Sequence, residues 1–331
     1  MNSKSSVGNE STCETSKLVE ERYKKVMSYE NEDLAAIIKF LYFCNRIMER
    51  EELFQIDLQA ILQSKAPRLA RRIPRVAVRF LSWLICQARL NECLRKGYGL
   101  SGVQFMQQKV ADDFSLTLEL RGVENLPTAT HRCIFASNHP LGGLDGICLS
   151  AVLGERYDGK IKYLVNDILY FIKPLQDIFI PINKHGAQAT GAVSLLNEAF
   201  ASDNQIITFP AGLCSRKRKG QIHDLEWKKM FVAKAIEYRR DIIPVFFDAR
   251  NSNFFYTFAA IRKKLGLKVN LEMLLLPREM FKSKGATFTI HFGKPIAWQT
   301  LDASKTAQQW AKEIEKTVYG NDSSSPPQGG D

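Results

Sequence analysis

Residues 133–146 read CIFASNHPLGGLDG, and this segment gives the clearest indication of the fold class. Cys133–Ser137 is a short apolar run typical of a buried strand, and the residues from Leu144 to Leu153 follow a helical pattern. A polar turn with two glycines joins them. A buried strand that passes through a tight turn into a helix is the building unit of α/β proteins.

The alternation of strand and helix continues along the chain from this unit. Short apolar or alternating runs predict strands at 116–120, 133–137, 160–165, 178–182, 205–209, 242–247 and 287–292. Helical periodicity predicts helices at 144–153, 192–201, 227–238, 254–265 and 307–318. We therefore expect an α/β fold with a largely parallel sheet flanked by helices, and with an N-terminal helical region.

The chain divides into four regions by composition and periodicity. Residues 1–16 are rich in Ser, Asn and Glu, and residues 321–331 are rich in Ser, Pro and Gly, so we expect disorder at both ends. Residues 17–100 follow a helical pattern and are a candidate for membrane association. Residues 101–320 form the predicted α/β domain.

One helix in the N-terminal region is amphipathic. Its predicted apolar face carries Ala77, Phe80, Leu81, Leu84 and Ala88, and its basic face carries Arg75, Arg79, Ser82 and Arg89. Such a helix packs on a neighbouring domain with its basic face in solvent, or it lies in a membrane interface with Trp83 near its middle. The sequence leaves both interpretations open.

The charge balance favours anionic partners. The 331 residues carry 46 Lys and Arg against 35 Asp and Glu, a formal net charge of +11. Lipid headgroups, an acidic carrier protein and nucleic acid all fit such a surplus. The basic runs lack the interleaved aromatic residues of a single-strand binder, so we expect an anionic membrane surface and no nucleic acid as partner.

The cysteines and the ends of the chain bear on the compartment. The seven cysteines form no C-x-x-C pair, which argues against a disulfide framework or a zinc ribbon and favours a reducing compartment. Residues 1–17 have no apolar core of a secretory signal, and no apolar run reaches the roughly 18 residues of a spanning helix. We expect a cytoplasmic protein, peripheral on the cytoplasmic face of the membrane.

The turn after the strand at 133–137 carries the candidate catalytic pair, His139 and Asp145. Ligands of open α/β sheets bind at the carboxyl ends of the strands, where His139 is expected. An imidazole titrates near neutral pH and suits a general base, while Asp145 is placed to accept a hydrogen bond from its other nitrogen. The alternative is purely structural: His139 caps the following helix and Asp145 stabilises its positive end.

Motifs of other enzyme classes are absent or misplaced. The sequence contains no G-x-S-x-G, Walker A or H-E-x-x-H motif, and its five histidines form no metal-spaced pair, so we expect neither metal nor cofactor. Gly97–Gly102 matches G-x-G-x-x-G, but a helical pattern precedes it. We interpret this segment as a hinge between the helical region and the α/β domain.

The chain resembles the phospholipid/glycerol acyltransferase superfamily, the lysophosphatidate acyltransferase-like enzymes. Four blocks occur in the order found in that superfamily: Asn138-His139 … Asp145, Phe179-Ile180-Pro181-Ile182-Asn183-Lys184, Phe209-Pro210-Ala211-Gly212 … Ser215-Arg216, and Ile243-Pro244-Val245. The resemblance extends from about Leu116 to Ile296. It implies a glycerolipid acyltransferase-like α/β fold.

Two departures from the superfamily pattern concern the site. Five residues separate His139 from Asp145 where the superfamily has four, and the glycine pair is available to absorb the extra residue. Ala211 replaces the acidic residue of the third block, which suggests a headgroup other than glycerol phosphate. The His-Pro-Leu-Gly-Gly-Leu-Asp variant resembles the bacterial branch that O-acylates monoacylated amino acids, as in ornithine or glycine lipids.

The resemblance implies an O-acyltransferase. A fatty acyl group would pass from an acyl carrier protein or coenzyme A thioester, as co-substrate, to the hydroxyl of a lysolipid, either a monoacylated amino acid lipid or lysophosphatidate. His139 would be the general base and Asp145 its partner. The residues expected to contact substrate are Asn138, Gly142, Gly143, Asn183, Lys184, Pro210, Gly212, Ser215 and Arg216.

Within that set, three expectations are specific. Backbone N–H groups of Gly142 and Gly143 are candidate donors to the developing oxyanion. Lys184 and Arg216 are candidates to bind the acceptor's phosphate or carboxylate, although each also fits a solvated basic position. Two alternatives to the O-acyltransferase remain: a non-catalytic lipid-binding protein on the same scaffold, and an N-acyltransferase.

Overall fold

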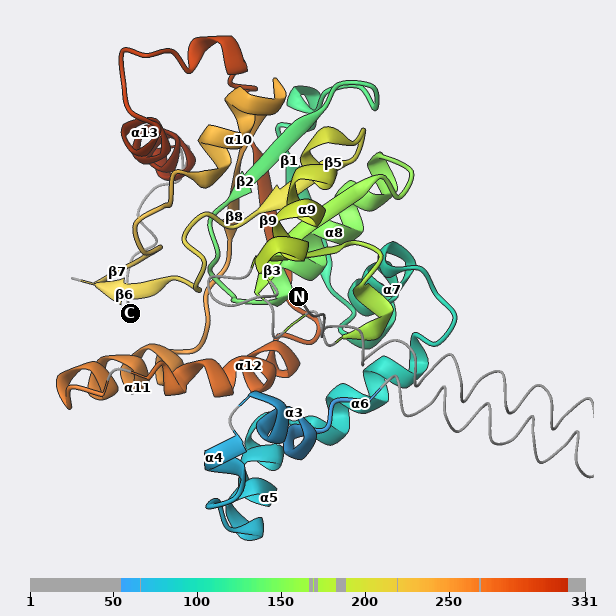
Figure 1. Cartoon of the computed structure of the whole chain (residues 1–331), viewed down its shortest axis with the longest axis vertical. Coiled ribbons are helices and arrows are strands. Elements are labelled where there is room, and N and C mark those ends of the chain that lie inside the picture. The colour runs from blue at the N-terminus through green and yellow to red at the C-terminus, as the bar shows by residue number, and fades with distance from the viewer. Residues whose placement is uncertain are drawn as a thin grey trace, which may run out of the picture. The chain divides into compact units, whose positions relative to one another are not determined.

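A computed structural model of the chain describes residues 55–65, 67–166, 169, 172–182, 189–218, 220–267 and 269–320. All of them belong to the unit that spans Phe54–Asp331 (Figure 1). The predicted disordered ends and the predicted helical residues before 55 lie outside the described residues, as do Asn183 and Lys184.

The centre of the structure is a seven-stranded sheet with the order β1-β9-β8-β2-β5-β3-β4. Its strands are β1 (Thr117–Arg121), β2 (Cys133–Ser137), β3 (Ile161–Asn166), β4 (Phe179–Ile182), β5 (Gln205–Thr208), β8 (Asp241–Asp248) and β9 (Thr287–Phe292). Every neighbouring pair is parallel except β8 and β9, which are antiparallel. The predicted largely parallel sheet is confirmed.

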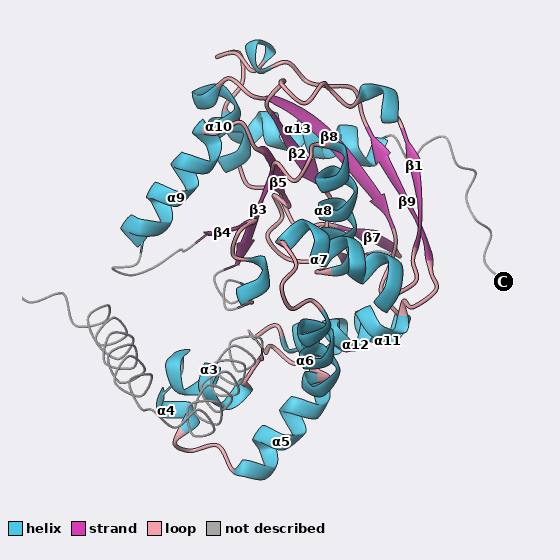
Figure 2. Cartoon of the chain, turned by 90° about the vertical axis from the view of Figure 1, so that its right-hand side faces the viewer, coloured by secondary structure: helices cyan, strands magenta, loops and turns pink. Residues whose placement is uncertain are grey.

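Helices cover both faces of this sheet (Figure 2). Alternate residues of β2 point to opposite faces, so Cys133 and Phe135 belong to one core while Ile134 and Ala136 belong to the other. The first core includes residues of α7 (Gly102–Gln108) and α8 (Leu144–Arg156). The second includes residues of α9 (Ala189–Ala201), α10 (Met230–Tyr238) and α13 (Ala307–Gly320). Burial on both faces explains why β2 is apolar from Cys133 to Ala136.

Two further helices follow the carboxyl end of β8. They are α11 (Asn253–Lys264) and α12 (Leu276–Lys282), and the 3₁₀ turn Leu271–Leu275 lies between them. The side chain of Ser252 caps α11 by accepting a hydrogen bond from the N–H of Phe255. A small antiparallel hairpin, β6 (Arg216–Arg218) with β7 (Gln221–His223), was not predicted because its strands are only three residues long.

The described part of the predicted helical region contains α3 (Leu58–Lys65), α4 (Pro67–Ala70), α5 (Arg75–Leu84) and α6 (Gln87–Lys96). The predicted amphipathic helix is wrong in its length. It ends at Leu84, and Cys86 adopts a left-handed φ of 53° before α6 begins, so Ala88 lies on another helix. Phe80, on the predicted apolar face, is 58% exposed, and α5 has no buried residue.

Candidate functional site

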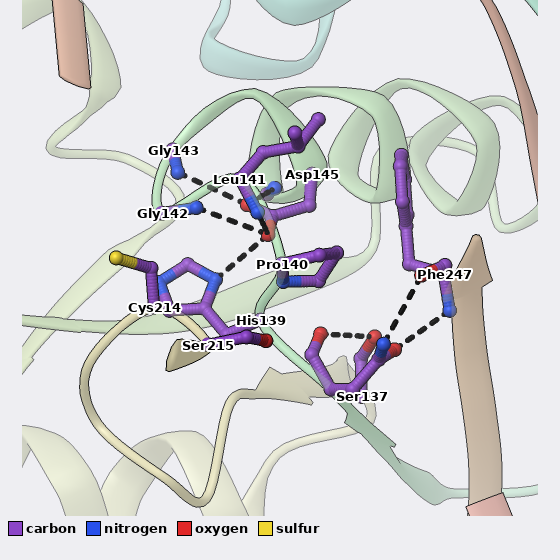
Figure 3. A network of polar contacts seen from close by, with 12 residues as sticks. Ser137, His139, Pro140, Leu141, Gly142, Gly143, Asp145, Cys214, Ser215 and Phe247 are labelled. Atoms are coloured by element: carbon purple, nitrogen blue, oxygen red, sulfur yellow. Dashed lines mark hydrogen bonds and ion pairs between the residues drawn. The ribbon is translucent and has the colours of Figure 1, made fainter. Parts of the chain in front are cut away.

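The loop after β2 is fixed to its neighbour strand by Asn138. The side-chain amide of Asn138 donates to the carbonyl oxygen of Phe247 at 3.1 Å, and its Oδ1 accepts from the N–H of Phe247 at 2.7 Å (Figure 3). Asn138 is buried. Both polar groups of the side chain are therefore engaged with β8, so the structure places Asn138 as an anchor of the loop and leaves its predicted substrate contact without support.

His139 and Asp145 lie together at the carboxyl end of β2. The Nδ1 of His139 lies 3.0 Å from Oδ2 of Asp145, which is fully buried, while the imidazole is 13% exposed. Asp145 also accepts hydrogen bonds at 2.9–3.2 Å from four backbone N–H groups, those of Leu141, Gly142, Gly143 and Gly146 (Figure 3). The hydrogen bond from Nδ1 leaves the other ring nitrogen, Nε2, as the proton acceptor.

Gly142 accommodates the additional residue between the pair. Its φ is 74°, a left-handed conformation that residues with a Cβ adopt at a cost. A Cβ at Gly142 would lie 2.8 Å from Cβ of Cys214 and 2.8 Å from Cδ1 of Leu276. Glycine at this position lets the loop coil around the Asp145 carboxylate without strain, and the spacing of five residues brings Asp145 to His139.

The two members of the pair shift each other's pKa. Burial lowers the pKa of His139, but the negative charge of Asp145 and its hydrogen bond outweigh burial, and the pKa lies above its ordinary value. Burial raises the pKa of Asp145, but the charge of His139 and the hydrogen bonds that Asp145 accepts outweigh that effect, so its pKa lies below its ordinary value. The arrangement favours an imidazolium beside a carboxylate and suits a group that takes up a proton.

The expected oxyanion donors are engaged elsewhere. The N–H groups of Gly142 and Gly143 both donate to the Asp145 carboxylate in this structure. They hold the partner of His139 in place, and the expectation that they face a developing oxyanion has no geometric support here. The glycine pair therefore stabilises the conformation of the loop around Asp145.

A second buried carboxylate, that of Asp224, holds the backbone of His139 in place. It accepts hydrogen bonds from the backbone N–H of His139 at 3.1 and 3.2 Å, from Oγ of Ser215 at 2.6 Å and from Nε1 of Trp227 at 2.9 Å. Burial raises the pKa of Asp224 above its ordinary value, although the hydrogen bonds from Ser215 and Trp227 act in the opposite direction. The backbone N–H of His139 and the indole N–H of Trp227 can only donate, so Asp224 serves here as a hydrogen-bond acceptor.

Sequence reasoning missed Asp224 because nothing in its neighbourhood marks it. It lies 85 residues after His139, and only the packing of the two loops brings them together. The same contact explains the position of Ser215. Its hydroxyl donates to Asp224, and its backbone N–H donates to the carbonyl oxygen of His139 at 2.8 Å, so Ser215 joins the two loops.

Arg216 has internal partners. Its guanidinium donates to the carbonyl oxygen of Cys214 at 2.6 Å and to Oε1 of Glu272 at 2.9 Å, and its side chain is 11% exposed. Glu272 is fully buried, and Nε of Arg262 lies 2.8 Å from its other oxygen. Glu272 thus partly neutralises the charge of Arg216, the residue that we expected from the sequence to bind the anionic group of the acceptor.

Of the remaining third-block residues, Phe209 lies beside the imidazole. The ring of Phe209 lies 4.2 Å from that of His139, centroid to centroid. Pro210 is buried and its carbonyl oxygen accepts from the N–H of Lys228, while Gly212 is exposed with a φ of 68°. Ala211 is buried in the second core, where an acidic side chain would be desolvated.

Neither a metal site nor a membrane-spanning helix is found in the described residues. No group of three or more His, Cys, Asp and Glu side chains there is arranged to hold a metal ion. None of the helices described has the length and apolar character needed to cross a bilayer.

Comparison with known proteins gives related sequences over most of the chain. A family model described as "Acyltransferase" matches residues 60–325. Lyso-glycine lipid O-acyltransferase of Bacteroides thetaiotaomicron is 47% identical over 272 residues, which are 82% of this chain and 99% of that protein. The protein of the same name from Phocaeicola vulgatus is 46% identical over 272 residues, 82% of this chain and 97% of its own length.

Among solved structures, the chain is similar to the 1-acyl-sn-glycerophosphate acyltransferase PlsC of Thermotoga maritima. The sequence identity is 16% and the TM-score is 0.44, over 73% of this chain and 87% of that one.

Proposed function

This chain belongs to the acyltransferase family and is an acyltransferase, and we propose that it O-acylates a lysolipid of the glycine type. The observation that carries the catalytic part of the proposal is the buried His139–Asp145 pair at the carboxyl end of β2. The identity of 46–47% with two lyso-glycine lipid O-acyltransferases over nearly their whole length supports the acceptor class.

The chemistry of glycine defines this acceptor further. Glycine offers an amine and a carboxylate but no hydroxyl, so a monoacylated glycine can be O-acylated only on a hydroxyl carried by its acyl chain. The acceptor then combines a fatty chain, a hydroxyl on that chain and a free carboxylate. The loss of the acidic third-block residue, Ala211 in this chain, agrees with a headgroup other than glycerol phosphate.

The reaction follows from the orientation of the imidazole. Asp145 accepts the hydrogen bond from Nδ1–H of His139, so Nε2 is free to take the proton from the acceptor hydroxyl as the hydroxyl oxygen attacks the thioester carbonyl. The new C–O ester bond forms, the C–S bond breaks, and the imidazolium returns its proton to the leaving thiolate. The charge of Asp145 stabilises the imidazolium in between.

The donor in this proposal is a fatty acyl thioester of acyl carrier protein or coenzyme A, both of which deliver the same electrophile. Because such donors are made in the cytoplasm and the acceptor is a lipid, the enzyme works as a peripheral protein on the cytoplasmic face of a membrane. Lys184 remains a proposed contact to the acceptor carboxylate. Arg216 also remains a proposed contact to that carboxylate, and it would have to bind it while its guanidinium is paired with Glu272.

An acceptor panel tests the proposal. Purified protein is incubated with each thioester donor and with monoacylated glycine bearing a chain hydroxyl, its matched analogue without that hydroxyl, hydroxylated monoacyl serine and ornithine, or lysophosphatidate. Thiol release and the mass of the lipid product are measured. We expect diacylated product from the hydroxylated glycine lipid and none from its matched analogue.

The alternatives give different outcomes in the same panel. Turnover of lysophosphatidate above that of the glycine lipid would contradict the proposed acceptor. Acylation of an amine would indicate an N-acyltransferase. Binding of lipid without release of thiol from either donor would indicate a non-catalytic lipid-binding protein.

A further inference from the structure

Exposed apolar side chains concentrate in two segments of the structure. Sixteen large apolar side chains are exposed in the described part of the chain, and nine of them lie in residues 76–83 or 254–271. The first segment is most of α5, and the second is α11 with the turn after it. Exposed apolar side chains are normal when scattered, but contiguous groups mark interaction surfaces.

On α5 the exposed residues form one stripe. Val76, Phe80 and Trp83 are 76%, 58% and 64% exposed, and their spacing of i, i+4 and i+7 places them on one side of the helix. The rings of Phe80 and Trp83 are 5.8 Å apart, so the stripe is continuous.

On α11 the same spacing recurs. Phe254, Ile261 and Leu265, at i, i+7 and i+11, are 59%, 53% and 69% exposed, and Phe258 lies between them with its ring stacked on that of Phe254. The opposite side of α11 is buried and faces the protein. The stripe continues into the turn after the helix through Leu267, Val269 and Leu271.

Charge accompanies both stripes. Residues 58–91 contain seven Lys and Arg and no Asp or Glu, and residues 249–271 contain five Lys and Arg and again no Asp or Glu. Two basic segments therefore coincide with the two exposed apolar stripes, and in the second segment Arg262 is paired with the buried Glu272 that follows it. Apolar residues beside Lys and Arg on one helix are typical of helices that lie in an anionic lipid interface.

Both segments meet near the proposed active site. Leu84, at the end of α5, packs against a buried cluster of Cys214, Phe255, Tyr256 and Leu275, which joins α5 to α11. Figure 1 shows both helices in the lower part of the view. α11 follows β8 at the same end of the sheet where His139 follows the adjacent β2, and Asn251 donates to the carbonyl oxygen of Pro140 at 3.1 Å.

We infer that α5 and the segment 253–271 form one surface that docks on an anionic lipid bilayer and brings the His139 loop to the membrane. The inference deepens the proposed function, because an enzyme with two fatty substrates gains access to both at a bilayer. The helix α5 was a sequence-based candidate for this role, whereas α11 was expected only as a helix of the α/β domain. The proposed partner of this surface is a lipid bilayer. The test below also detects the alternative, in which a second copy of this chain covers the surface.

Vesicle binding by the full chain tests this surface. Cosedimentation is measured with vesicles of phosphatidylcholine alone and of phosphatidylcholine with phosphatidylglycerol. The triple variant Phe254→Ser, Ile261→Ser, Leu265→Ser removes the α11 stripe, and Val193→Ser with Ile236→Ser is the matched control, since these residues are 53% and 40% exposed on α9 and α10.

We expect the wild-type protein and the control to bind anionic vesicles, and the triple variant to bind about tenfold less tightly or weaker. Lys263→Glu with Lys264→Glu should weaken binding to anionic vesicles by about fivefold or more for each residue and leave binding to phosphatidylcholine unchanged. Equal vesicle binding by the triple variant and the wild type would overturn the inference. It would also be overturned if the wild type bound no vesicles and sedimented as a dimer while the triple variant sedimented as a monomer.

Turnover of detergent-dispersed acceptor separates this inference from the proposed function. None of the substituted residues belongs to the catalytic loop, so all variants should retain that turnover. If the wild type binds vesicles and the triple variant does not, but no protein turns over the acceptor, the proposed function alone is contradicted. If the proteins turn over the acceptor and the triple variant binds vesicles as well as the wild type does, the proposed membrane-docking surface alone is contradicted.

Discussion

At the scale of single residues, His139 is held by two carboxylates with different tasks. Asp145 contacts the ring through Nδ1 and fixes its tautomer, while Asp224 accepts the backbone N–H and fixes the place of the residue itself. Both negative charges favour the imidazolium, and Arg216 opposes them. Since the raised pKa belongs to the base, kcat/KM should rise with pH with an apparent pKa above about 6.5.

Asp224→Asn tests the second carboxylate. The amide removes one negative charge and turns a donor group toward the donors of His139 and Trp227, so kcat should fall and the apparent pKa of the kcat/KM profile should move down. Glu226→Gln is the matched control, because Glu226 is an exposed acid two residues away. A profile of Asp224→Asn that coincides with that of the wild type would leave Asp224 a structural residue only.

At the scale of elements, the loop from β2 to α8 depends on one left-handed glycine. Gly142→Ala adds a strained φ and a clash with Cys214 and Leu276, so it should lower the free energy of unfolding by about 2 kcal/mol or more. Gly143→Ala is the control, because no atom lies within 4 Å of its added Cβ and its φ of 175° lies outside the left-handed region.

Urea unfolding monitored by circular dichroism compares the two variants. Equal stability of Gly142→Ala and Gly143→Ala would contradict the tight packing of this loop against Cys214 and Leu276. The comparison is made at one pH, because the pKa values of His139 and Asp145 both depend on the loop.

At the scale of the whole molecule, the α/β architecture was predictable because it rests on local periodicity. The strands of the large sheet after β1 each carry their own apolar signal, and burial on both faces makes that signal strong in β2, β5 and β8. The antiparallel placement of β9 was not predictable, because strand order depends on pairing between distant segments. The short β6–β7 hairpin gave too few residues for a pattern.

In the candidate site too, contacts between residues close in sequence were predictable and contacts between distant residues were not. His139 and Asp145 lie six positions apart, so the sequence could pair them, and the structure brings them to 3.0 Å. Asp224 and Glu272 reach His139 and Arg216 across 85 and 56 positions, and nothing local announces either contact. Arg216 therefore looked free in the sequence although Glu272 binds it, and Asn138 looked available although β8 takes both its polar groups.

The central claim is that the imidazole of His139 is the base of an acyl transfer. The most direct measurement is the initial rate of His139→Ala with acyl thioester and hydroxylated monoacyl glycine both saturating, after circular dichroism has shown a wild-type fold. We expect a rate about 10²- to 10⁴-fold below that of the wild-type protein. A folded His139→Ala protein that transfers acyl groups within a few-fold of the wild-type rate would contradict it.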